Sequence, residues 1–380
     1  MVSRKLAHLH PAEARVLALY SFGAVLSQSC GISKISALLS MLLRQKPNTL
    51  RQRLRELTYA GEDKRGEKRR SLQVEHSFGD LLKWVISWWA SREQRLALVL
   101  DATSFRNIFT VLTISVVYRG CALPVAWKVL KSEQKGEWQP HWESLIDALS
   151  PAVPIDWFVV VLADRGLYAK WLYQKCVQVK WHPFLRINQQ GQFRPQRNRC
   201  FRLLSSVVHA QRPDWSGRVT CFRTKDCQLD CTLLAHFDPT FNDPWLVVTD
   251  LAPQQADMTW YGMRSWIEAG FKDLKRGGWG WHHTKMKDPA RAERLWLVLS
   301  VATLWTLSVG GYTETQFSPS SFASLPDVWP VSPKGHRRLS CFTLGRLAIL
   351  AAFIQHLPVF VCEFVYEHWP SSSWKFQPLC

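Results

Sequence analysis

Two short apolar runs that each end in an aspartate decide the fold expected of this chain: LALVLD at residues 96–101 and WFVVVLAD at residues 157–164. Continuous apolar runs of this length are typical of strands that are buried on both faces of a parallel sheet. We therefore expect each aspartate to stand at the carboxyl end of a strand. If the two strands are parallel neighbours, Asp101 and Asp164 meet at one edge of the sheet.

The segment between these runs supports a parallel arrangement. Phe109–Val117 and Ala122–Val129 are β-rich and flank a turn at residues 118–120, which predicts a hairpin. Trp142–Leu149 has helical periodicity. Strand, hairpin, helix and strand is an α/β order whose crossover brings the second strand back parallel to the first.

A helix beginning at Asp257 and ending at the Gly277–Gly278 pair carries a third acid. At about 100° per residue, five polar side chains fall on one narrow face of this helix. They are Tyr261, Arg264, Glu268, Lys272 and Lys275, while the apolar residues Trp260, Met263, Ile267, Phe271 and Leu274 fall on the other side. An ordinary solvated face with salt bridges would have the same pattern, so the interpretation depends on context.

The two aspartates supply that context. Two strand-end aspartates and a glutamate on a nearby helix can hold two Mg²⁺ or Mn²⁺ ions about 4 Å apart for attack on a phosphodiester. Cations beside the glutamate can grip the phosphates of the scissile strand. Glu133, Glu137 and Glu143 are alternative third acids, but they lack a cationic face.

The spacing Tyr261-x2-Arg264-x3-Glu268-x6-Lys275 resembles the Tyr-Arg-Glu-Lys signature of bacterial insertion-sequence transposases of the DDE class, in the insertion-sequence-four branch. Asp101 in VLDATS and Asp164 in LADRGLY resemble the two aspartates of that family. The resemblance covers roughly residues 10–310. It implies an RNase H-like core that uses Asp101, Asp164 and Glu268 to cut transposon ends and join the 3′-OH to target DNA.

The resemblance also implies roles in DNA binding. Tyr261, Arg264 and Lys275 would hold the phosphates of the transposon end, and face geometry alone adds Lys272. Trp215 is a candidate for stacking on a base flipped out near the end, because related transposases use a tryptophan of the insertion in this way.

Charge predicts the same kind of partner. The chain has 380 residues, with 48 Lys and Arg against 30 Asp and Glu, for a net charge of +18. Such an excess favours a polyanion, and double-stranded DNA is the leading candidate. Most of the excess lies between Arg165 and Lys225, where short strand-like runs broken by Gly and Pro predict an inserted antiparallel β region. Its expected DNA contacts are Arg194, Arg197 and Arg199.

The N-terminal residues predict three helices, over Ala12–Ser29, Ser33–Leu43 and Thr49–Tyr59. On the third, Arg51 and Arg55 lie off the leucine stripe, which suits a DNA contact of the helix-turn-helix kind. An ordinary helical domain with a solvated basic face is the alternative.

Several classes of protein are disfavoured. Ten cysteines are too few for a disulfide framework, which together with the lack of a leader pattern favours a reducing cytosol and no membrane partner. The apolar run Leu295–Val309 is shorter than the roughly 20 residues needed to cross a bilayer and predicts a buried helix. Cys221, Cys227, Cys231 and His236 lack a close C-x2-C pair, so we expect buried thiols rather than zinc ligands.

The expected plan is an α/β protein with five parts. They are a helical DNA-binding region and linker (1–76), the first part of the catalytic core (77–183), a β-stranded insertion (184–250), the second part of the core (251–315) and a C-terminal helical region (316–380). We expect a Mg²⁺-dependent transposase associated with the bacterial nucleoid and dimeric on DNA. The alternatives are a nuclease or resolvase on the same fold, and a catalytically dead DNA-binding copy.

Overall fold

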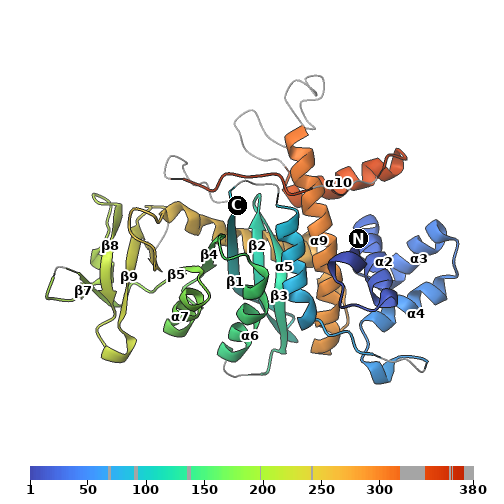
Figure 1. Ribbon diagram of the computed structural model, residues 1–380, viewed down its shortest axis with the longest axis horizontal. Helices are drawn as coiled ribbons and strands as arrows, with labels where there is room; N and C mark the ends of the chain where they lie inside the picture. The colour runs from blue at the N-terminus through green and yellow to red at the C-terminus, as the bar shows by residue number, and fades with distance from the viewer. Residues whose placement is uncertain are drawn as a thin grey trace. The chain divides into compact units, whose positions relative to one another are not determined.

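The computed structural model describes residues 1–66, 70–89, 93–134, 138–196, 198–240, 243–316, 339–358, 361 and 363–371 (Figure 1). The fold is mixed α/β, as predicted, with mostly antiparallel strand pairs. The chain divides into two compact units. One comprises Met1–Arg92, Ala102–Pro154 and Trp266–Glu367, and the other comprises Glu93–Asp101, Ile155–Ser265 and His368–Cys380.

The second unit holds the predicted parallel strands. In β1 (Arg95–Phe105), residues 95–100 pair in parallel with β4 (Phe158–Ala163), and the last pair of the ladder is Leu100 with Ala163. β4 pairs in parallel with β5 (His182–Arg186), which follows α7 (Lys170–Gln178). The parallel arrangement predicted from the two apolar runs is therefore confirmed.

The insertion continues this sheet with antiparallel strands, also as predicted. β10 (Trp245–Thr249) pairs with β5 and with β9 (Leu229–His236), and β9 pairs with β8 (Asp214–Cys221). The short strands β6 (Gln192–Pro195) and β7 (Arg202–Leu203) complete the order β1-β4-β5-β10-β9-β8-β6-β7. Along β8, exposed residues alternate with buried or half-buried ones.

The first unit contains the predicted hairpin. β2 (Phe109–Tyr118) and β3 (Cys121–Lys131) are joined by Arg119 and Gly120, which both have positive φ. Positive φ at both loop residues is the geometry that a tight two-residue hairpin requires. Four helices contact β3: α5 (Phe78–Ser87), α6 (Gln139–Leu149), α8 (Trp266–Lys272) and α9 (Pro289–Gln316).

α9 is the central helix of this unit and lies between the hairpin and the N-terminal helices (Figure 1). The predicted buried run Leu295–Val309 lies inside it and is confirmed as buried, apart from the half-buried Trp305. Among the described residues, α9 is long and apolar enough to cross a membrane, but 89% of its most apolar stretch of 18 residues is buried inside the protein. The helices at residues 11–27 and 32–43 are long and apolar enough only when taken together, and the chain bends by 97° between them. α10 (Cys341–Ile354) packs closely on α9, since a Cβ at Gly345 would overlap the carbonyl of Thr306.

The N-terminal helices match the predicted ranges to within two residues. They are α2 (Pro11–Ser27), α3 (Ile32–Leu43) and α4 (Pro47–Leu57), preceded by the single turn α1 (Val2–Lys5). The Ser21 hydroxyl donates to the carbonyl of Val298 at 2.9 Å, which ties α2 to α9. α4 contacts α2, and α2 in turn packs on the buried helix α9.

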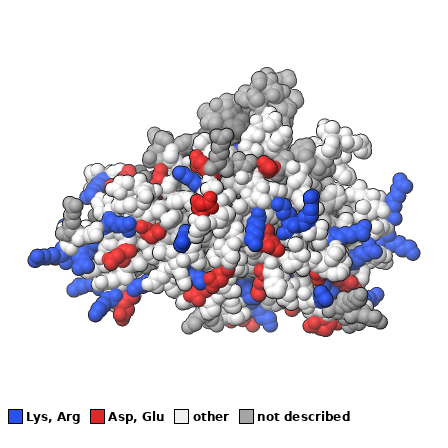
Figure 2. Space-filling view, viewed as in Figure 1, with Lys and Arg blue, Asp and Glu red and all other residues white. Residues whose placement is uncertain are grey.

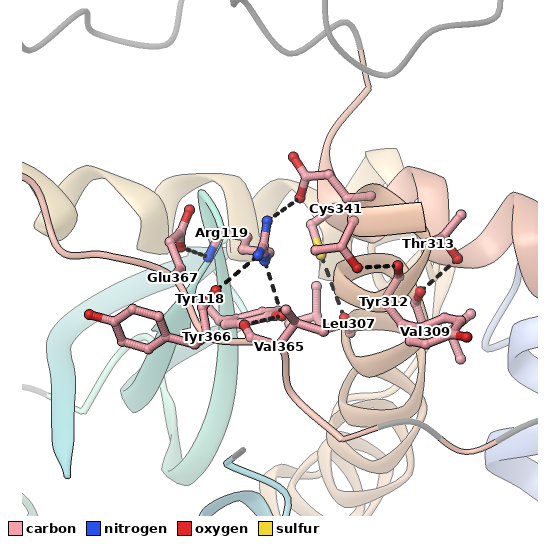
Figure 3. Close-up of polar contacts among 12 residues, drawn as sticks. Tyr118, Arg119, Leu307, Val309, Tyr312, Thr313, Cys341, Val365, Tyr366 and Glu367 are labelled. Carbon is pink, nitrogen blue, oxygen red and sulfur yellow. Dashed lines mark hydrogen bonds and ion pairs between the residues drawn. The ribbon is translucent and has the colours of Figure 1, made fainter. Parts of the chain in front are cut away.

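Arg119 fastens the C-terminal segment to the hairpin (Figure 3). Its backbone N–H donates to Glu367, and its guanidinium donates to Glu314 at 2.9 Å and to the carbonyl of Tyr366 at 3.1 Å. The Tyr118 hydroxyl donates to the carbonyl of Val365. These contacts require an extended segment here.

The expectation that the chain is helical to its end is therefore wrong, because the described residues after Ile354 contain no helix. Side chains of the hairpin bond the carbonyls of Val365 and Tyr366, which in a helix would accept from the segment's own backbone. The predicted loop at 317–333 lies outside the described residues.

Candidate active site

Asp101 and Asp164 follow the last paired residues of two neighbouring parallel strands. They occupy equivalent register positions, one residue beyond the Leu100–Ala163 pair. Asp101 was expected to end its strand, but β1 continues to Phe105. Asp164 begins a turn in which one of its oxygens accepts from the N–H of Gly166 at 2.9 Å. The side chains are 17% and 37% exposed, so both carboxyl groups reach the surface.

Arg264 bridges the two aspartates. Its Nη2 lies 2.9 Å from Oδ2 of Asp101 and 3.4 Å from Oδ2 of Asp164. Only 17% of the Arg264 side chain is exposed, so this ion pair is partly shielded from water. Three residues far apart in the sequence thus meet at the edge of one sheet.

The segment that carries Arg264 is not one uniform helix. A 3-10 helix, η6 (Met258–Ser265), leads into α8, and a π-turn, η7 (Asp273–Gly277), follows it. The cap is as predicted, since Asp257 accepts from the N–H of Thr259 at 2.9 Å, and the helical segment ends at Gly277. The constant 100° spacing assumed for the signature is wrong, because a 3-10 helix has about three residues per turn and a π-turn has more than an α-helix.

Tyr261 shows the consequence. It is 4% exposed and packs edge-on against the ring of Trp245, with centroids 5.4 Å apart. Burial raises the pKa of its phenol well above the usual range. The structure thus places Tyr261 in the core of its unit and not on an exposed polar face.

Glu268, Lys272 and Lys275 belong to the other compact unit. Glu268 and Lys272 are exposed on α8, and Gly270 of the same helix lies against Ala122 of β3, where a Cβ would come within 2.8 Å. The Lys275 ammonium donates to the Thr103 hydroxyl at 2.6 Å and to the Ser104 carbonyl at 2.9 Å. Burial lowers its pKa.

The donor atoms suit a divalent cation only in part. Asp101 and Asp164 offer hard oxygens that already converge on one cationic group, which is the chemistry that Mg²⁺ and Mn²⁺ prefer. No group of three His, Cys, Asp or Glu side chains among the described residues is assembled to hold a metal ion. The aspartate pair supplies two of the three predicted ligands, and Arg264 lies between them.

The insertion carries a basic hollow of about 660 Å³. It is lined by Arg194, Gln196, Asn198, Arg199, Arg218, Val219, Thr220, Asp230 and Cys231. Arg194 pairs with Thr220 across β6 and β8, and Thr220 pairs with Asp230 across β8 and β9, so these side chains share one face of the sheet. Arg197 lies outside the described residues.

Sequence reasoning missed Arg218, although a signal was present. On β8, Ser216 and Arg218 are exposed and alternate with buried or half-buried residues, and such an alternation places Arg218 on the same face as Thr220. Trp215 lies within this strand, on the face opposite Arg218. The Trp215 ring packs edge-on against the Phe193 ring, with centroids 5.7 Å apart, and Trp215 is half-buried.

The end of the N-terminal helical region is basic and exposed. Residues 41–49, which include the three-residue connection between α3 and α4, are all exposed. On α4, Leu50, Leu54 and Leu57 are buried, whereas Arg51 is exposed and Arg55 half-buried. Lys and Arg side chains are visible over α3 and α4, and also over β7 and β8 (Figure 2).

Two of the four cysteines of the insertion are buried, so the expectation of buried thiols is wrong for Cys227. Cys221 and Cys231 are buried with their Sγ atoms 3.8 Å apart, whereas Cys227 is exposed. His236 is held by Asp214 on the neighbouring strand at 2.6 Å. Of the alternative third acids, Glu143 accepts from Gln139 within α6, Glu133 is exposed and Glu137 lies outside the described residues.

The chain matches the model of a known protein family. Residues 92–305, more than half of the chain, match the family model described as a transposase DDE domain. The matched range includes Asp101, Asp164, Arg264 and Glu268. No curated protein matches the sequence.

Proposed function

Because this chain belongs to the transposase DDE domain family, we propose that it cleaves the ends of an insertion sequence and joins the freed 3′-OH to target DNA. The observation that carries this proposal is the register of β1 and β4, which sets Asp101 and Asp164 side by side within the matched range. The spacing from Tyr261 to Lys275 supports a place in the insertion-sequence-four branch, on an RNase H-like core.

Asp101, Asp164 and Glu268 would hold the divalent metal, Mg²⁺ or Mn²⁺, that transposases of this class normally use. When bound, two such ions supply charge stabilisation to the attacking and leaving oxygens of an in-line displacement. The part of this chain is to place the carboxylates. Backbone pairing at Leu100 and Ala163 fixes both aspartates before any ligand arrives.

Arg264 and Lys275 are the proposed ligands of the scissile phosphate. A guanidinium can make a planar two-pronged contact to a phosphate, and an ammonium adds a point charge. Lys272 is exposed on the same helical segment and would extend this contact. The burial of Tyr261 argues against a direct phosphate contact in this conformation and favours a supporting role beside Arg264.

Basic surfaces in both units would bind the remaining double-stranded DNA. On α4, Arg51 and Arg55 lie off the buried leucine stripe, and an exposed three-residue turn precedes the helix, which supports a DNA contact of the helix-turn-helix kind. In the insertion, Arg194, Arg199 and Arg218 line a hollow whose charge suits phosphates. Two transposon ends require two such surfaces, so we propose a dimer on DNA, in the nucleoid.

A strand-transfer assay tests the function. Purified protein is incubated with Mg²⁺, a labelled DNA that carries the inverted repeat flanking the coding region, and a supercoiled target plasmid. We expect labelled 3′ ends joined to the plasmid. Hydrolysis without joining would favour a nuclease or resolvase on the same fold. DNA binding with neither reaction would favour a catalytically dead copy.

A further inference from the structure

One guanidinium nitrogen holds two carboxylates that the backbone forces together. Nη2 of Arg264 is 2.9 Å from Oδ2 of Asp101 and 3.4 Å from Oδ2 of Asp164, so these oxygens cannot be farther apart than the sum of the two distances. Equivalent register positions on adjacent parallel strands keep the backbones of the two aspartates side by side. Two like charges at such a separation repel one another strongly unless a cation lies between them.

The position of Arg264 is fixed by its neighbours in the chain. Met263 is 1% exposed and Tyr261 4%, so the last turn of η6 is anchored in the core of its unit. The guanidinium itself is only partly exposed. Because the backbone is anchored and the ion pair is partly shielded from water, the Arg264 guanidinium is held against the two carboxylates.

A metal ion would need the same oxygen atoms. Mg²⁺ binds carboxylate oxygens at about 2.0–2.1 Å and demands near-octahedral geometry. Oδ2 of each aspartate faces Nη2, so a metal ion held by both carboxylates would compete with the guanidinium for them. A divalent cation and a guanidinium also repel one another, which makes joint occupancy unfavourable.

We propose that Arg264 is the resident counter-cation of the Asp101–Asp164 pair, and that a divalent metal binds this pair only as the guanidinium leaves. Metal loading then releases Arg264 toward the phosphate of the DNA end. The release toward DNA rests on the proposed function, but the competition between guanidinium and metal does not. Arg264 is in this respect a positioning residue that keeps the carboxylates together before the metal arrives.

Metal affinity without DNA tests the competition directly. Mn²⁺ is titrated into the full-length protein, and free Mn²⁺ is followed by electron paramagnetic resonance. We expect Arg264→Ala to bind Mn²⁺ at least about tenfold more tightly than the wild type, since a competing cation has been removed. Arg264→Lys, which keeps the charge, should stay closer to the wild type.

Two controls locate the effect. Arg223→Ala removes the same charge from an exposed site in the same compact unit, where Gln228 uses only the backbone carbonyl of Arg223, and should leave Mn²⁺ affinity unchanged. Asp101→Asn should weaken Mn²⁺ binding in both the wild-type and the Arg264→Ala background. Equal tightening by Arg223→Ala would mean a general charge effect and would overturn the proposal.

Thermal melts provide a second measurement that does not depend on activity. In EDTA at low salt, Arg264→Ala should melt below the wild type, because the aspartates lose their counter-cation, and Mn²⁺ should raise its Tm by more than that of the wild type. A folded Arg264→Ala variant with equal or weaker Mn²⁺ affinity would refute the competition. A failed strand-transfer assay with the expected Mn²⁺ result would refute only the proposed function.

Discussion

At the scale of residues, the register of β1 and β4 places the carboxyl groups of Asp101 and Asp164 next to each other. The side chains around this pair decide whether it binds a cation. The cation beside them is Arg264 in this structure, at 2.9 and 3.4 Å. Glu268 lies on a helix of the other compact unit, so its part in the site depends on more than the register of one sheet. Each of these residues can be tested by a substitution that removes one charge.

We expect Asp101→Ala, Asp164→Ala and Glu268→Ala each to abolish cleavage of a transposon end and to leave DNA binding largely intact. Each change removes a proposed metal ligand and no proposed phosphate contact. Cleavage is measured on a labelled end and binding by gel shift. Glu143→Ala, which removes an alternative acid on α6, is the matched control and should cut normally. Near wild-type cleavage by any of the first three variants would remove that residue from the catalytic set.

At the scale of elements, the segment from Met258 to Gly277 changes its hydrogen-bonding pattern twice, from 3-10 to α to π. The π-turn begins at Asp273, whose backbone carbonyl accepts from the N–H of Trp279 at 2.8 Å. Burial raises the pKa of the Asp273 carboxyl to about 7, although the nearby charges of Arg346 and Lys272 act in the opposite direction. The element therefore has a pH-dependent stability.

The direction of this dependence follows from proton binding. The folded chain holds the Asp273 proton up to about pH 7, whereas the unfolded chain loses it near its ordinary value of 3.8. The stabilisation is thus complete below the unfolded pKa and is lost as the pH rises to about 7. We expect the free energy of unfolding to fall by at most about 1.4 kcal/mol for each pH unit in this window.

Asp273→Asn should flatten that part of the profile, because an amide does not titrate. Urea unfolding between pH 4.5 and 8 measures it, with the exposed Asp156→Asn as the control that keeps the wild-type slope. A slope that is the same in Asp273→Asn and in the wild type would show that another group is responsible.

At the scale of the whole molecule, the net charge of +18 is carried by surfaces in both compact units. Arg51 lies on α4 in one unit, and the basic hollow lies on the insertion in the other. DNA binding shared between such surfaces depends strongly on salt, because each neutralised phosphate releases counterions. Removing part of one surface should weaken binding without removing it.

The double variant Arg194→Ala, Arg199→Ala should lower the slope of log K against log salt by about 0.9 for each lost phosphate contact. Fluorescence anisotropy with a labelled end duplex at several salt concentrations gives this slope. Lys83→Ala, Lys131→Ala removes the same charge from exposed positions of the other unit and should change the slope less. Equal slopes for the arginine variant and the wild type would show that the hollow makes no phosphate contact.

Local patterns in the sequence were sufficient for the elements. Periodicity predicted α2, α3 and α4 to within two residues, and the two apolar runs predicted the parallel pairing of β1 with β4. Short strand-like runs broken by Gly and Pro predicted the antiparallel strands of the insertion. These features depend on residues a few positions apart, where side-chain burial and backbone hydrogen bonds follow directly from the order of apolar and polar residues.

Only the tertiary structure decided how the polar residues of the site meet. Arg264 contacts aspartates that lie 163 and 100 positions away, and no local pattern encodes that contact. Tyr261 is buried against Trp245, and the segment that carries the signature changes from 3-10 to α to π, so a constant 100° per residue does not apply to it. A helix takes such departures where packing outweighs the small differences among helical hydrogen-bond patterns. The sequence therefore predicted the candidate residues of the site, and long-range packing decided that Arg264 contacts Asp101 and Asp164.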